Sequence, residues 1–105
     1  MDGNKRYNII YLPVARRDLI NIIDYIAFDL EVPDTAIKML DTIEASIQRL
    51  RDNPFRGNVY SSGKFNDVPY RQLFIKNYIV FYLILEDTVE IQRILYNKRD
   101  IGKLL

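Results

Sequence analysis

Cationic side chains and one tyrosine stand near the ends of apolar segments in the second half of this 105-residue chain. Arg71 stands at the beginning of one segment, and Tyr96 stands at the end of another. The other candidate cations in this half are Lys64, Lys76, Arg93, Lys98 and Arg99. Guanidinium groups bind phosphate through two hydrogen bonds, and lysine adds a point charge. Tyrosine can stack on bases, and it can transfer a proton if its pKa falls. These residue types indicate an anionic ligand.

The same residues also have an ordinary structural interpretation. Arg71 and Arg99 could be solvated, or could pair with Asp67 and Asp100, while Tyr96 could be half buried in the core. The sequence contains eight tyrosines, so the presence of any one of them is weak support for a catalytic role.

Composition excludes several classes of chemistry. The sequence contains no cysteine and no histidine, which rules out disulfides, zinc sites of the His or Cys type, and Ser-His-Asp or Cys-His catalysis. We predict no metal site and no cofactor. No signal peptide is visible, and no apolar run approaches the roughly 18 residues of a membrane span. We therefore expect a single cytoplasmic domain over residues 1–105.

Three consecutive strands are predicted over residues 70–75, 77–85 and 89–100. The middle strand contains seven apolar residues in a row, Ile79 to Leu85, a pattern typical of a strand buried on both faces. Residues 76–77 and 86–88 are short turn-type connections, so the three strands should pair antiparallel.

The first half predicts a strand over residues 7–12 and then two helices. Pro13 suits the first position of a helix, whose apolar stripe comprises Ala15, Leu19, Ile22, Ile23, Ile26 and Leu30. Asp34 or Thr35 could cap the second helix, whose apolar residues are Ala36, Leu40, Ile43, Ile47 and Leu50. The short connection predicts an antiparallel helical hairpin. Residues 53–69 are expected to form a long irregular loop, and residues 100–105 a tail with one helical turn.

This order of elements, β-α-α-β-β-β, predicts an α+β fold in which the helical hairpin covers one face of a small, mainly antiparallel sheet. Arg71 starts its strand, while Tyr96, Lys98 and Arg99 end theirs. We expect these residues to meet at one edge of the sheet. The apolar pattern around Arg93 is irregular, and a bulge there would decide which face Arg93 and Tyr96 present.

Nearly the whole chain resembles the RelE/ParE superfamily of toxins from bacterial type II toxin–antitoxin modules. The likeness rests on the order of elements and on short patterns, of which no single one is diagnostic. These patterns are Tyr70-Arg71-x-Leu73, Asn77-Tyr78-x-Val80-Phe81-Tyr82 and Ile91-x-Arg93-Ile94-Leu95-Tyr96-x-x-Arg99-Asp100. The resemblance implies a cytoplasmic toxin of a plasmid-stabilising or addiction module, which a small antitoxin wraps and neutralises.

The resemblance leaves two activities open. RelE-like members cut messenger RNA in the ribosomal A site without a metal ion, whereas ParE-like members inhibit DNA gyrase by binding it. Under the RelE reading, which is the one we favour, Arg71, Tyr96 and Arg99 are catalytic. Lys64, Lys76, Arg93 and Lys98 then bind RNA phosphates. A third alternative is a small RNA-binding domain that is not toxic.

The absence of histidine matters for RNA cleavage, because the reaction needs a base for the 2′-hydroxyl and an acid for the leaving oxygen. Tyr96 stands approximately where many relatives carry histidine, and Lys64, Lys98 or a carboxylate are the other candidate bases. A tyrosine hydroxyl has an ordinary pKa of about 10, so it would need help from cations such as Arg93 or Arg99.

Overall fold

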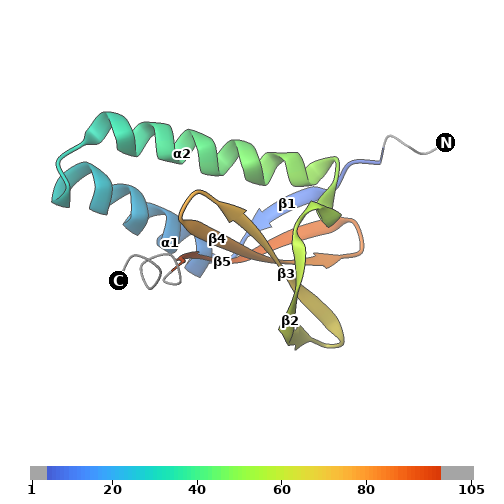
Figure 1. The fold of residues 1–105 in the computed structure, drawn as a ribbon. Coiled ribbons are helices and arrows are strands. Elements are labelled where there is room, and N and C mark those ends of the chain that lie inside the picture. Colours follow the sequence, from blue (N-terminus) through green and yellow to red (C-terminus); the bar gives the residue numbers. More distant parts are fainter. Residues whose placement is uncertain (1–4, 98–105) are drawn as a thin grey trace.

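The structure, a computed structural model, describes residues 5–97. Its helices and strands follow the order β1 (Asn8–Tyr11), α1 (Pro13–Asp24), α2 (Pro33–Gln48), β2 (Asn58–Phe65), β3 (Val68–Ile75), β4 (Tyr78–Leu85) and β5 (Thr88–Tyr96). Two helices form an antiparallel hairpin over one face of the sheet, and the β2–β3 hairpin extends away from them (Figure 1). This arrangement confirms the predicted α+β class.

The five strands lie in the order β1-β5-β4-β3-β2. β1 pairs parallel with β5, and the other three pairs are antiparallel. Both predicted turns are present, with positive φ at Lys76 and Glu86. The core lies between the sheet and the helical hairpin, where Ala15 and Leu19 of α1 and Ile43 and Ile47 of α2 are buried. The middle strand is buried on both faces as predicted, since the consecutive residues Ile79 and Val80 are both buried.

The expected loop over residues 53–69 is mostly a strand, so that prediction is wrong. Pro54–Arg56 forms a short 3-10 turn, and β2 then pairs with β3. Asn66 and Asp67 both have positive φ in the connecting hairpin turn, a conformation that these residue types tolerate well. Glycine and asparagine, which both occur in β2, have low strand propensity, and the β2–β3 register is irregular between Val59 and Lys64. The segment is nevertheless a strand because it pairs with β3, and this pairing outweighs the low strand propensity of its residues.

The bulge that the sequence left undecided lies in β5. Phe81 pairs with Arg93, whereas Tyr82 pairs with Ile91, so Gln92 is the extra residue. The bulge changes the alternation along β5, and Val89, Ile91 and Ile94 are all buried in the same core. Tyr96 continues this core-facing series beyond the bulge and lies on the side of the helices, as its place among the cavity-lining residues below shows.

The tip of the helical hairpin departs from the predicted helices in two ways. Tyr25–Asp29 forms a π-helical turn after α1, and it leaves Leu30 exposed rather than in the apolar stripe. The second helix begins at Pro33 with no side-chain cap hydrogen bond, so the predicted cap at Asp34 or Thr35 is wrong. Proline starts a helix well because its φ angle is already helical and its missing N–H would be unpaired there.

Candidate functional site

Arg71, the first candidate residue, holds a neighbouring turn. Its Nη2 donates hydrogen bonds to the backbone oxygens of Phe55, at 3.1 Å, and Gly57, at 2.8 Å. Its guanidinium carbon lies 5.2 Å from the centre of the Phe55 ring, which is within the distance of a cation–π contact. Its Nε is buried without a hydrogen-bond partner. Much of this guanidinium group is therefore engaged by the chain itself.

Tyr82 fastens the same turn from the adjacent strand, β4. Its hydroxyl donates to the backbone oxygen of Pro54, at 2.7 Å, and accepts from the backbone N–H of Gly57, at 3.1 Å. Burial raises the pKa of Tyr82, although the hydrogen bonds from Gly57 and Arg71 oppose the rise. A Cβ atom at Gly57 would lie 2.5 Å from this hydroxyl oxygen and 2.8 Å from the backbone oxygen of Gln72. Only glycine allows the turn to approach the sheet this closely.

Tyr96, the second candidate, lies at the other end of the sheet among aromatic side chains. It pairs across the strands with Tyr78, and the two ring centres are 5.6 Å apart in an edge-to-face arrangement. Burial raises the pKa of Tyr78 above its ordinary value, and neighbouring Tyr96 and Tyr25 add to the rise. The Tyr78 hydroxyl is accordingly protonated at neutral pH.

The strand register keeps Arg71 and Tyr96 apart. Arg71 lies beside Tyr82 of β4, whereas Tyr96 lies beside Tyr78, which in turn pairs with Ile75. Four residues along β3 separate the two rows, about 13 Å at the usual rise of a strand. The expectation of a shared edge is wrong because β3 and β5 are both antiparallel to β4 and hence run in the same direction. The start of one strand and the end of the other therefore lie at opposite ends of the sheet.

Arg93, a predicted phosphate ligand, is paired within the chain. Its Nε and Nη2 donate to the carboxylate of Asp18 on α1, at 2.8 and 3.0 Å. The same carboxylate accepts the backbone N–H of Ile94, at 2.9 Å. Burial alone would raise the pKa of Asp18, but the hydrogen bonds and the Arg93 charge hold this pKa below its ordinary value. The Asp18 carboxylate thus provides an acceptor for a backbone N–H of β5 at Ile94, beyond Ile91, the last β5 residue that pairs with β1.

The remaining predicted cations do not form one cluster in the described chain. Lys64 is exposed near the β2–β3 turn, and Lys76 is exposed in the β3–β4 turn. Lys98 and Arg99 lie outside the described residues, as does the predicted tail over residues 100–105. Among the described residues, no group of three or more histidine, cysteine, aspartate or glutamate side chains could hold a metal ion.

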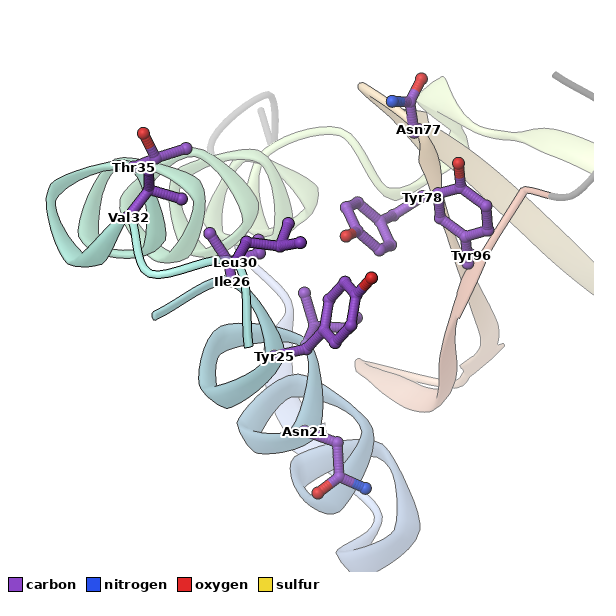
Figure 2. A pocket seen from close by; sticks show the side chains of 10 residues that line it. Asn21, Tyr25, Ile26, Leu30, Val32, Thr35, Asn77, Tyr78 and Tyr96 are labelled. Carbon is purple, nitrogen blue, oxygen red and sulfur yellow. The ribbon is translucent and has the colours of Figure 1, made fainter. Parts of the chain in front are cut away.

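A cavity of about 680 Å³ opens between the hairpin tip and the end of the sheet. Its lining residues are Asn21, Ile22, Tyr25, Ile26, Leu30, Val32, Thr35, Asn77, Tyr78 and Tyr96. Figure 2 shows the rings of Tyr25, Tyr78 and Tyr96 close to one another, with Leu30 and Val32 on the helical side. Sequence reasoning missed this cavity, because the π-helical turn that exposes Leu30 leaves no clear periodic signal.

The fold is similar to those of two solved toxin–antitoxin systems. One is the chromosomal ParDE system from P. aeruginosa, with 19% sequence identity and a TM-score of 0.72 over 89% of this chain and 98% of that chain. The other is the toxin–antitoxin complex RelBE2 from Mycobacterium tuberculosis, with 20% identity and a TM-score of 0.58 over 87% of this chain and 98% of that chain. No curated protein matches this sequence significantly.

The family model for the ParE toxin of the type II toxin–antitoxin system parDE matches residues 9–101. The chain belongs to this family, and the RelE/ParE resemblance noted from the sequence is confirmed. It is a toxin of a type II toxin–antitoxin system. Within the described residues, no helix is long and apolar enough to cross a membrane.

Proposed function

We propose that this toxin arrests growth by binding a protein target, DNA gyrase, and not by cutting messenger RNA. The observation that carries the proposal is the separation of Arg71 from Tyr96 by four strand positions. A nuclease needs its phosphate-binding cation and its proton-transfer group around the same few atoms, within about 3 Å of each of them. The mechanism favoured from the sequence alone was RNA cleavage, and the geometry supports the ParE-like alternative better.

The charge state of the candidate residues also supports a binding function. Arg93 forms an ion pair with Asp18, and Arg71 donates to two backbone oxygens. Both guanidinium groups would have to give up hydrogen bonds within the chain before they could hold a phosphate fully. Burial raises the pKa of Tyr78, so its hydroxyl adds no charge beside Tyr96 near pH 7.

The surface around the hairpin tip suits a protein better than a nucleic acid. Residues 24–35 contain four acidic side chains and no lysine or arginine, so this surface repels a phosphate backbone. Phe28 is 72% exposed, and Tyr25, Leu30 and Val32 are also exposed. Apolar side chains exposed together are a usual mark of a protein interaction site.

The test runs two assays side by side with the same toxin preparation. We expect inhibition of supercoiling by purified gyrase, and intact messenger RNA in a purified translation system that contains loaded ribosomes. Cuts in the ribosome-bound message with normal gyrase activity would overturn the proposal and restore RNA cleavage. Binding to RNA without either effect would favour the third alternative, a small RNA-binding domain.

We further propose a cognate antitoxin, a small protein from an adjacent gene, and a cytoplasmic setting in a plasmid-stabilising module. Support for the antitoxin comes from the two similar structures, which are described as a toxin–antitoxin system and a toxin–antitoxin complex. Co-expression with the adjacent small gene should yield a stable complex and restore growth. A neighbouring product that neither co-purifies with the toxin nor restores growth would contradict this assignment.

A further inference from the structure

Three tyrosine rings face the cavity beneath the hairpin tip. Tyr78 and Tyr96 lie opposite each other on neighbouring strands, with their ring centres 5.6 Å apart. Tyr25 comes from the π-helical turn on the other side of the cavity, and Figure 2 shows its ring beside that of Tyr78. Tyr25 and Tyr96 are exposed, so their rings are accessible from solvent. The three rings form one aromatic group at an open site.

No cation of the described residues covers these three rings. Within residues 5–97, cations lie over three other aromatic rings, in the pairs Lys5–Tyr7, Arg16–Tyr11 and Arg71–Phe55. The face of an aromatic ring carries negative potential and attracts a cation that approaches it. Tyr25, Tyr78 and Tyr96 therefore offer ring faces to a cation of a bound partner.

The residues next to the cavity lining add negative charge on the helical side. Asp29, Glu31 and Asp34 each stand beside a lining residue in the sequence, and all three are exposed. Among the described residues, Lys76, beside Asn77, is the only cation that adjoins a lining residue in this way. A surface whose charge is mostly negative raises the local concentration of cations and repels anions. The charges around the cavity thus select a positively charged occupant.

The size of the cavity and its surroundings indicate a protein as the source of this cation. The cavity of about 680 Å³ has room for more than one side chain, and its lining residues Leu30 and Val32 are exposed. Phe28, in the same π-helical turn as Tyr25, is also exposed and extends the apolar surface beyond the cavity. A small organic cation would leave this apolar surface uncovered, whereas a protein surface would cover it.

We propose that this cavity binds a cationic side chain of the toxin's protein target between the rings of Tyr25, Tyr78 and Tyr96, while an adjoining apolar side chain of the target packs on Leu30 and Val32. Arginine suits the site better than lysine, because a guanidinium group is planar, stacks on aromatic faces and is more weakly hydrated than an ammonium group. The inference rests on the proposed binding function, and it states what gyrase must present to the toxin.

Amide NMR titrations of the full-length toxin with short blocked peptides test the site without gyrase. One peptide alternates leucine and arginine, and its matched counterpart alternates leucine and glutamine. The arginine peptide should bind about tenfold more tightly than the glutamine peptide. It should shift the signals of Tyr25, Tyr78 and Tyr96 and leave that of Ile20, an exposed residue of a separate hollow, in place. Equal affinities, or shifts confined to other parts of the toxin, would overturn the proposal.

Two substitutions at Tyr25 separate the aromatic face from apolar contact and from the hydroxyl group. Tyr25 is exposed, so its replacement does not empty the core. Tyr25→Phe keeps the ring, whereas Tyr25→Leu keeps an apolar side chain without a ring. We expect the leucine variant to bind the arginine peptide about fivefold more weakly than the phenylalanine variant. Equal affinities of the two variants would contradict a cation held by the ring.

The acidic residues are tested in the same titration at low ionic strength, where the attraction of exposed charges is least screened. Asp29→Asn with Glu31→Gln should weaken binding of the arginine peptide several-fold. Asp41→Asn with Glu44→Gln is the matched control, since it removes the same charge from exposed positions of α2, and it should weaken binding much less. Equal weakening in the two variants would show only an effect of net charge and would count against the site.

Growth arrest and gyrase inhibition extend the test to the target itself. Tyr25→Leu should weaken both effects, whereas Tyr60→Leu, which removes an exposed tyrosine of β2, should leave both in place. Full toxicity of a folded Tyr25→Leu variant would overturn the inference. If the unmodified toxin leaves gyrase active, gyrase is the wrong target, and the peptide titrations with the growth assay still decide whether the cavity binds a cation. The two failures are therefore distinguishable.

Discussion

Arg71 on β3 and Tyr82 on β4 use their polar groups for hydrogen bonds that hold the fold together. Arg71 and Tyr82 lie opposite each other, and together they make four hydrogen bonds to the turn at residues 54–57. The turn follows α2 and leads into β2, so these side chains join the helical layer to the outer part of the sheet. Arg71 is then best understood as a residue that positions this turn.

A change at Tyr82 should test the turn network. Tyr82→Phe keeps the ring but leaves the Gly57 N–H and the Pro54 oxygen without their buried partner. An unsatisfied buried polar group costs about 1–3 kcal/mol, so we expect the free energy of unfolding to fall by about that amount in urea titrations. Tyr60→Phe is the matched control, since that ring packs edge-to-face on Phe81 at 5.3 Å and is partly exposed. An equal loss in both variants would contradict the role of the Tyr82 hydroxyl.

At the scale of elements, one ion pair connects α1 to the bulged part of β5. Asp18 receives two guanidinium hydrogen bonds and one backbone N–H, and its side chain is 12% exposed. β5 has no β1 residue paired with it beyond Ile91. The Asp18 carboxylate accepts the Ile94 N–H there, as a neighbouring strand's carbonyl oxygen would. The register change at Gln92 brings the Ile94 N–H to this carboxylate.

The low pKa of Asp18 predicts a pH dependence of stability. A carboxyl group whose pKa is depressed by folding stabilises the protein above its unfolded pKa of about 3.9 and loses this effect as pH falls through the folded value. Asp18→Asn should therefore be less stable than the unmodified protein by about 1 kcal/mol at pH 7, since Arg93 is half exposed and its pairing is screened. The difference should close below about pH 4. A difference that stays constant down to pH 3 in urea titrations would contradict this.

At the scale of the whole molecule, the sheet separates two regions. One end carries the turn held by Arg71 and Tyr82, and the other carries the aromatic cavity under the hairpin tip. Figure 1 shows the helical hairpin extending beyond the sheet on the side opposite the β2–β3 hairpin. A toxin that works by binding a protein can use such a protruding tip, whereas a nuclease would need the two regions to converge.

Removal of one hydroxyl group distinguishes these activities in cells. Tyr96→Phe keeps the edge-to-face packing on Tyr78 and removes only the group that could transfer a proton. If the toxin acts by binding, growth arrest should be unchanged within about twofold in the dose of inducer. Loss of a general acid or base typically costs about 100-fold to 10,000-fold in rate, so a large loss of toxicity in a folded variant would point to catalysis. Circular dichroism provides the check on folding.

The sequence alone determined much of the fold, because the signals are local. The apolar run from Ile79 to Leu85 predicted a strand buried on both faces, and the short connections at residues 76–77 and 86–88 predicted antiparallel pairing; both are confirmed. Absence of cysteine and histidine excluded whole classes of chemistry. The predicted order of elements was sufficient to point to the RelE/ParE toxins, and the family match confirms it.

Only the tertiary structure decided how the candidate residues stand to one another. Strand direction reverses at each antiparallel pairing, so the distance between Arg71 and Tyr96 depends on the register of three strands and not on the spacing of residues along the chain. The carbonyl oxygens that engage Arg71 come from a turn 14 to 16 residues away, and the carboxylate that pairs with Arg93 lies 75 residues away. These partners meet through packing, which no local pattern of residue types specifies.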